Sequence, residues 1–195
     1  MDWEASRKRL ELAQEIFGGI LQIEQRTSFW WSLGIMIVWA QLRGLEQVML
    51  DMVTEPEWTH RAVQFISDGR LHMLDDLERQ GLLSLNNGNH YIGSGSFGFT
   101  NELPAPGFEP GHVRTRDMWG FTEGQEITGV SPAMHWEFAL QYEVPIHARF
   151  GLTWSLSEKP SMIITTNPEK RPTDNDLVPE RAITRPQRGC ISRMN

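Results

Sequence analysis

The feature that most constrains the fold is a sharply bounded helix over residues 131–151. Ser131 stands where an N-cap hydroxyl accepts a hydrogen bond from a free backbone N–H, and Pro132 follows at the first helical position, where a missing N–H costs nothing. Gly151 suits the left-handed residue that ends a helix. Apolar residues recur at every fourth position between these marks: Met134, Phe138, Tyr142, Ile146 and Phe150. This stripe predicts a helix with one side packed on a sheet.

The loop before this helix carries Glu123, Gln125 and Glu126. Open and closed α/β folds place their ligand sites in loops that follow strands. The two carboxylates could act as an acid and base pair or orient a ligand. They could equally cap the helix that follows, and the sequence alone leaves both interpretations open.

The rest of the chain alternates between helical and strand patterns. Helices are expected over 3–17, after a turn at 28–34, over 42–52 and over 54–81, and strands over 20–25, 82–85, 113–119 and 152–154. Thr54 and Glu57 have the spacing of a capping box, and Asp51 is expected on a solvated face. The glycine-rich segment 88–113 is expected to form an ordered flap rather than a phosphate loop, because no helix pattern follows it. Strands alternating with helices predict an α/β fold with a parallel sheet.

Composition limits the possible partners. The chain has 195 residues, a formal net charge of −7 and one cysteine, Cys190. This acidic balance argues against a nucleic-acid partner, because contacts with phosphate backbones need clustered lysine and arginine. The longest apolar run, residues 29–40, is shorter than the ~20 residues that span a bilayer. We therefore expect a cytoplasmic protein without a membrane segment or an internal disulfide.

The composition changes abruptly near Ser155. No aromatic residue occurs from Ser155 to Asn195, whereas all eight tryptophans precede this point. The same stretch is rich in proline, which is typical of unfolded or loosely attached segments. We expect a folded domain over residues 1–154 and a disordered or frameshifted tail over residues 155–195.

Other common site chemistries lack the required spacing. The histidine pairs His60/His72 and His135/His147 are each twelve residues apart, so the sequence predicts no metal site. There is no G-x-S-x-G nucleophile motif. His90 differs from the other histidines because it follows an expected strand end beside asparagines and a tyrosine, where either a ligand contact or a structural hydrogen bond would suit it.

Four stretches together resemble a known family. They are R-T-S-F-W-W-S-L-G (26–34), L-R-G-L-E-Q-V-M-L-D-M-V-T-E-P-E-W-T-H-R (42–61), S-L-N-N-G-N-H-Y-I-G-S-G (84–95) and D-M-W-G-F-T-E-G-Q-E-I-T-G-V-S-P-A-M-H-W-E-F-A-L-Q-Y (117–142). Their order resembles the uroporphyrinogen decarboxylase superfamily, in particular an uncharacterised bacterial branch. The resemblance covers roughly residues 3–154.

The resemblance implies a (β/α)8 TIM barrel, of which this chain would supply a part, because a complete barrel takes about 250 residues. It also implies two chemistries: cofactor-free decarboxylation of porphyrinogen-type substrates, and corrinoid-dependent methyl transfer with zinc held by His and Cys. The zinc cysteines of the second branch have no counterpart here. A third hypothesis is a truncated, non-catalytic ligand-binding product. An incomplete barrel would expose strand edges through which copies could self-associate.

These considerations define one candidate site for a small-molecule substrate. The expected catalytic residues are Glu123, Glu126 and His90, and no metal ligands or cofactor are expected. The expected substrate-binding residues are Arg26, Trp30, Asn86, Asn87, Tyr91 and Gln125.

Overall fold

The computed structural model describes residues 2–27, 29–93 and 96–156. Helices and short sheets alternate in it, as the expected α/β class requires. The tail expected over 155–195 lies outside the described residues apart from Ser155 and Leu156, which continue the last strand.

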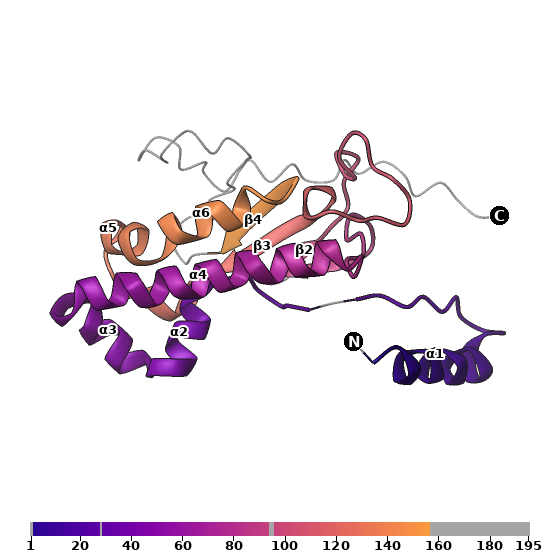
Figure 1. Ribbon diagram of the computed structural model, residues 1–195, viewed down its shortest axis with the longest axis horizontal. Coiled ribbons are helices and arrows are strands. Elements are labelled where there is room, and N and C mark those ends of the chain that lie inside the picture. Colours follow the sequence, from indigo (N-terminus) through magenta and orange to yellow (C-terminus); the bar gives the residue numbers. More distant parts are fainter. Residues whose placement is uncertain (1, 28, 94–95, 157–195) are drawn as a thin grey trace, which may run out of the picture.

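Helices make up most of the described chain (Figure 1). They are α1 (Trp3–Phe17), α2 (Ile35–Arg43), α3 (Leu45–Thr54), α4 (Pro56–Arg79), α5 (Pro132–His135), the π-helical segment Trp136–Leu140 and α6 (Gln141–His147), with two short 3-10 helices at Thr115–Asp117 and Gln125–Ile127. The long helix α4 packs against α2, α3 and α6. The expectation that one helix runs from residue 42 to 52 is wrong, because Gly44 adopts a positive φ of 87° and separates α2 from α3.

Two short sheets complete the described structure. Strand β1 (Tyr91–Gly93) pairs antiparallel with β2 (Ser96–Phe97) in the expected flap. Strand β3 (Trp119–Glu123) pairs parallel with β4 (Leu152–Leu156), in register from Trp119 opposite Leu152 to Glu123 opposite Leu156. Because α5 and α6 connect β3 to β4, this part of the chain is one β-α-β unit, with the helices beside the two strands (Figure 1).

The predicted stripe packs on helix α4 as well as beside β3, so the expectation that it packs on a sheet holds only in part. Phe138, Ile146 and Phe150 are buried in the core that α2, α3 and α4 share with this unit. The Ser131 hydroxyl accepts the N–H of Met134 at 3.2 Å, which confirms the predicted N-cap. The predicted C-cap is wrong, since α6 ends at His147. Gly151 instead allows a close approach: a Cβ there would lie 2.3 Å from the carbonyl oxygen of Arg116.

Two expected strands are not formed. Residues 20–25 are mostly exposed and pair with no described strand. Residues 82–85 contain the buried Leu82 and Leu83. Side chains from residues 26 and 27, however, bond to the backbone carbonyls that a neighbouring strand would use. The Thr27 hydroxyl donates to the Leu82 carbonyl, and Arg26 Nη1 donates to the Leu85 carbonyl at 2.5 Å.

The strand expected over 113–119 begins only at Trp119. The buried Asp117 carboxylate accepts hydrogen bonds from the backbone N–H and the guanidinium of Arg114, at 3.0, 2.7 and 2.9 Å. This pairing turns residues Thr115–Asp117 into a 3-10 helix. A local side-chain to backbone interaction therefore overrides strand propensity here.

The expected capping box before α4 is also wrong. Thr54 is the last residue of α3, its hydroxyl donates to the Leu50 carbonyl at 3.1 Å, and Glu55 stands at the N-cap of α4. Asp51 is not solvated as expected but 1% exposed, and it accepts hydrogen bonds from Arg43 Nε and Gln47 Nε2, each at 2.7 Å.

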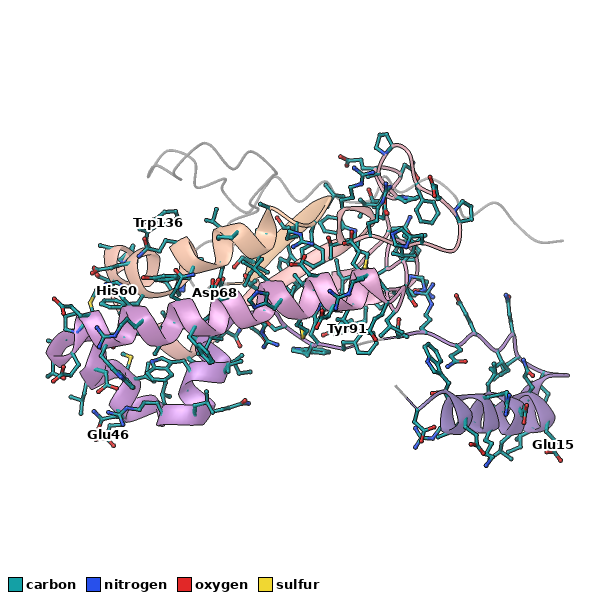
Figure 2. All side chains as sticks on the ribbon, in the orientation of Figure 1. Glu15, Glu46, His60, Asp68, Tyr91 and Trp136 are labelled. Atoms are coloured by element: carbon teal, nitrogen blue, oxygen red, sulfur yellow. The ribbon has the colours of Figure 1, made fainter. Side chains whose placement is uncertain are left out.

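Helix α1 has the predicted bounds but lies apart from the other helices (Figures 1 and 2). The Asp2 carboxylate caps it by accepting the N–H of Ala5 at 2.9 Å, and none of its residues is buried. Figure 2 shows its side chains, Glu15 among them, clear of the packed region that contains His60 and Asp68. Thus α1 contributes little to the site described below.

Candidate functional site

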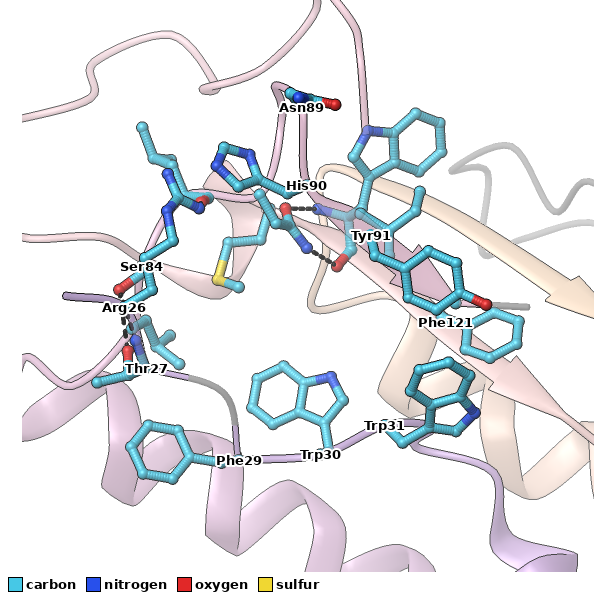
Figure 3. A pocket seen from close by; sticks show the side chains of 17 residues that line it. Arg26, Thr27, Phe29, Trp30, Trp31, Ser84, Asn89, His90, Tyr91 and Phe121 are labelled. Atoms are coloured by element: carbon cyan, nitrogen blue, oxygen red, sulfur yellow. Dashed lines mark hydrogen bonds between the residues drawn. The ribbon is translucent and has the colours of Figure 1, made fainter. Parts of the chain in front are cut away.

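A cavity of about 430 Å³ lies between residues 26–27 and 29–31, the segment 83–86, strand β1 and the start of β3 (Figure 3). Arg26, Trp30, Asn86, His90 and Tyr91 line it. They come from positions up to 65 residues apart in the sequence, and the fold brings them to one space. Its volume is within the range of about 300–1,000 Å³ that is usual for small-molecule sites.

The Asn86 side chain fixes the wall nearest β3. Its Oδ1 accepts the backbone N–H of Trp119 at 2.8 Å, and its Nδ2 donates to the carbonyl oxygen of Trp119 at 3.0 Å. One amide thus bonds Trp119 as a neighbouring strand would. The indole N–H of Trp119 donates to the Gly98 carbonyl at 3.0 Å, which ties the flap to the same strand.

Aromatic rings form the opposite wall and one end of the cavity. Trp30 projects into the space, and Trp31 lies against Tyr91 with ring centroids 4.9 Å apart (Figure 3). Trp119 and Phe121 line the cavity from alternate positions of β3, and the Leu33 N–H donates to the Phe121 carbonyl at 2.9 Å. That bond holds the tryptophan-bearing segment beside the strand.

Arg26 stands at the other end of the cavity, near Thr27 and Ser84 (Figure 3). Its Nη1 donates to the Leu85 carbonyl, and its Nε lies 3.2 Å from the Glu24 carboxylate. The hydrogen bond and charge of Arg26 lower the pKa of Glu24. This end of the cavity therefore presents a guanidinium on a fixed support.

His90 adds a titratable group to the lining. Burial lowers its pKa, and the charge of Arg26 lowers it further, so the neutral imidazole is favoured at pH 7. Its Nδ1 accepts the Gly88 N–H at 3.2 Å. Because a neutral imidazole has one accepting and one donating nitrogen, this bond places the proton on Nε2.

The expected site residues divide into two groups. Arg26, Trp30, Asn86, His90 and Tyr91 line the cavity, whereas the remaining four do not: Asn87, Glu123, Gln125 and Glu126. The Asn87 amide donates to the Leu103 carbonyl at 2.6 Å and so holds the loop after the flap. Gln125 is exposed.

Glu123 and Glu126 belong to a separate group of carboxylates at the end of β3. Burial raises the pKa of Glu126, and the nearby charge of Glu123 raises it further. Glu143 on α6 is the third member of this group. Burial raises its pKa to about 7, and the nearby charge of Glu126 adds to the increase. Its Oε1 accepts the Ile35 N–H at 3.1 Å, at the first residue of α2. Glu143 is thus a buried cap that joins two helices.

Several residues of these sites were not predicted. Trp31, Trp119 and Phe121 line the cavity, and the alternation of Trp119 and Phe121 along one face of a strand is the sequence signal that could have identified two of them. Glu143 and His147, one turn apart on α6, are buried polar residues with no comparable signal. Their positions depend on tertiary packing.

No group of three or more His, Cys, Asp or Glu side chains arranged to hold a metal occurs within residues 2–27, 29–93 and 96–156. In those same ranges no helix is long and apolar enough to cross a membrane. Comparison with protein-family models, with curated proteins and with solved structures gives no match for this chain.

Proposed function

We propose that the chain forms part of a (β/α)8 barrel of the uroporphyrinogen decarboxylase type. The parallel β-α-β unit from β3 to β4 supports this proposal. Further support comes from residues 26–27 and 29–33 and from the segment 82–86, which lie beside each other and beside β3 through the contacts of Thr27, Leu33 and Asn86. In such a barrel, neighbouring strands would stand side by side in the same way.

The proposed activity is decarboxylation of a small ring compound bound in the cavity. The observation that carries it is the joint placement of Arg26 and His90 around a space that six aromatic side chains also line: Phe29, Trp30, Trp31, Tyr91, Trp119 and Phe121. Arg26 anchors an anionic group of the ligand through charge-assisted hydrogen bonds. That anionic group is the reacting carboxylate itself. The neighbouring Trp30 ring keeps water from it, so the localised charge is destabilised more than the dispersed charge of the transition state.

In the proposed step the bond between the ring carbon and the carboxylate carbon breaks, and CO2 leaves. The bonding electron pair stays on the ring carbon. The imidazolium form of His90, which the lowered pKa makes a stronger acid, then gives its proton to that carbon and is left as the neutral imidazole. It takes up a proton from solvent before the next turnover, so the reaction is R–COO⁻ + H⁺ → R–H + CO2. General acid catalysis of this kind contributes about 10²–10⁴-fold to a rate.

The test is CO2 release by the full chain from uroporphyrinogen and from a panel of aromatic carboxylic acids, with products identified by mass spectrometry. We expect His90→Gln to reduce the rate at least about 100-fold. His72→Gln removes an exposed histidine of α4 and is the matched control, expected to keep the wild-type rate. Wild-type turnover by His90→Gln, or no CO2 release from any substrate, would refute the proposal.

We also propose a cytoplasmic setting and self-association through an open sheet edge. Among the described residues, β4 pairs with β3 alone, and an unpaired edge is a template for another strand. Light scattering of the purified chain across a concentration series tests this, with a constant monomer mass as the contrary outcome.

A further inference from the structure

We infer that the cavity takes a flat aromatic compound anchored through a single anionic group, in place of the ring with many carboxylates that the family resemblance implies. This inference rests on the proposed function only for the choice of cavity. It follows from three properties of the lining: its charge, the bonding of Arg26 and the placement of the rings.

The charge of the lining matches one anion. Among the described residues that line the cavity, Arg26 is the one permanent cation, and neither Asp nor Glu is present. His90, the other basic group, has its pKa lowered by burial. A ligand with many carboxylates would need several cationic partners, because each carboxylate that leaves water requires compensating donors.

Arg26 is available to bind that anion. Its side chain is 31% exposed, and its described contacts are with the Leu85 carbonyl and the Glu24 carboxylate. A guanidinium carries five N–H donors, so donors remain for a ligand. Glu24 already offsets part of the positive charge, which further limits this end of the cavity to one anionic group.

The rings are placed to hold a flat molecule. Trp30 rises into the middle of the space, between Arg26 at one end and Tyr91 and Phe121 at the other (Figure 3). Beyond Trp31 the aromatic contacts continue outward through Tyr91 and Phe97, whose centroids are 6.2 Å apart. A fused or extended aromatic ring can therefore stack inside the cavity while its acid group reaches Arg26.

The experiment measures quenching of tryptophan fluorescence in the full chain by four probes. They are 2-naphthoate, the neutral 2-naphthalenemethanol, the non-aromatic cyclohexanecarboxylate and the many-carboxylate uroporphyrin. We expect 2-naphthoate to bind at least about tenfold more tightly than either small comparison probe, because only it satisfies both the guanidinium and the rings. Uroporphyrin is expected to bind more weakly than 2-naphthoate.

Variants assign the effect to the residues. Arg26→Gln should remove the preference for naphthoate over the neutral alcohol and leave binding of the alcohol unchanged, which also shows that the variant is folded. Trp30→Leu should weaken both naphthalene probes, and Arg9→Gln, on the exposed surface of α1, should change neither.

Equal binding of the acid and the alcohol by wild type, or tighter binding of uroporphyrin, would overturn the inference. Its failure is distinguishable from failure of the proposed function. Porphyrinogen turnover without naphthoate binding would keep the function and refute the ligand class, whereas naphthoate binding without CO2 release would do the reverse.

Discussion

Replacing Glu143 by Gln should give the protein a pH-dependent stability that the wild type lacks. Glu143 is 2% exposed, and burial raises its pKa from 4.5 to about 7. His147, one turn later on α6, is 4% exposed, and burial lowers its pKa from 6.5 to about 4. Thr122 Oγ1 donates its one proton to Ser155 Oγ at 3.1 Å. It therefore accepts a hydrogen bond from Nε2 of the neutral His147 imidazole, 2.9 Å away.

The two groups shift stability in opposite directions over nearly the same pH window. Glu143 contributes stability that is fully present below pH 4.5 and lost as the pH rises to 7, because the folded state holds a proton that the unfolded chain releases. His147 contributes stability that is present above pH 6.5 and lost as the pH falls to 4. Each contribution is about 3 kcal/mol at ~1.4 kcal/mol per pH unit, so the wild-type sum is nearly level.

The Glu143→Gln variant keeps an acceptor for the Ile35 N–H but removes the titration. The free energy of unfolding of the variant minus that of wild type should therefore be about 3 kcal/mol larger at pH 7.5 than at pH 4.5, so the variant gains relative stability as the pH rises. Urea unfolding followed by tryptophan fluorescence at a series of pH values measures this difference. Glu46→Gln, an exposed carboxylate on α3, is the control that should show no such trend.

Substitution of His147 by Asn should produce the opposite slope, with stability falling as the pH rises from 4.5 to 7. A difference between Glu143→Gln and wild type that stays constant within 1 kcal/mol across this range would refute the reasoning. It would mean that Glu143 is ionised in the folded state at pH 6, which its burial and the neighbouring Glu126 oppose.

Three further substitutions test the packing. Gly120→Ala should lower the free energy of unfolding by about 1–3 kcal/mol, since its Cβ would lie 2.5 Å from the Phe150 ring. Gly69→Ala has open space in the middle of α4 and should raise the free energy of unfolding by up to about 1 kcal/mol. Urea unfolding that ranks the two variants the other way would contradict this. Asp51→Asn should cost about 2 kcal/mol at pH 7, because it weakens the charge-assisted bonds from Arg43. Those bonds hold the pKa of Asp51 below its ordinary value, so the loss should shrink as the pH falls below 4, while exposed Asp68→Asn should show neither effect.

The sequence predicted elements whose signals are local and mutually consistent. The Ser131 cap predicted the start of the helix, which is confirmed. The stripe of five apolar residues predicted its buried face, and three of the five are buried: Phe138, Ile146 and Phe150. The ends of elements were harder where a side chain from elsewhere decides the outcome. Nothing in residues 113–119 shows that Arg114 and Asp117 will pair and fold the chain into a 3-10 turn.

The candidate site could be predicted only in part, because local signals do not show which segments the fold brings together. Five expected residues line the cavity. They were predicted because they follow expected strands, and α/β folds gather their ligand groups at that end of a strand. Glu123 and Glu126 were grouped with them because they too follow a strand. The structure instead places them with Glu143, whose position near α2 could not be inferred from its place in an amphipathic helix.

The failure of residues 82–85 to form a strand bears directly on the cavity. A regular ladder would use the carbonyls of Leu82 and Leu85 for backbone bonds, whereas here Thr27 and Arg26 bond to them. Asn86 then takes the place of a strand neighbour for Trp119. The bond to Leu85 holds the Arg26 side chain at one end of the cavity, where it stays partly exposed. The irregular backbone therefore determines where the Arg26 guanidinium stands at the end of the cavity, and it is this departure from a regular strand that the proposed anion binding depends on.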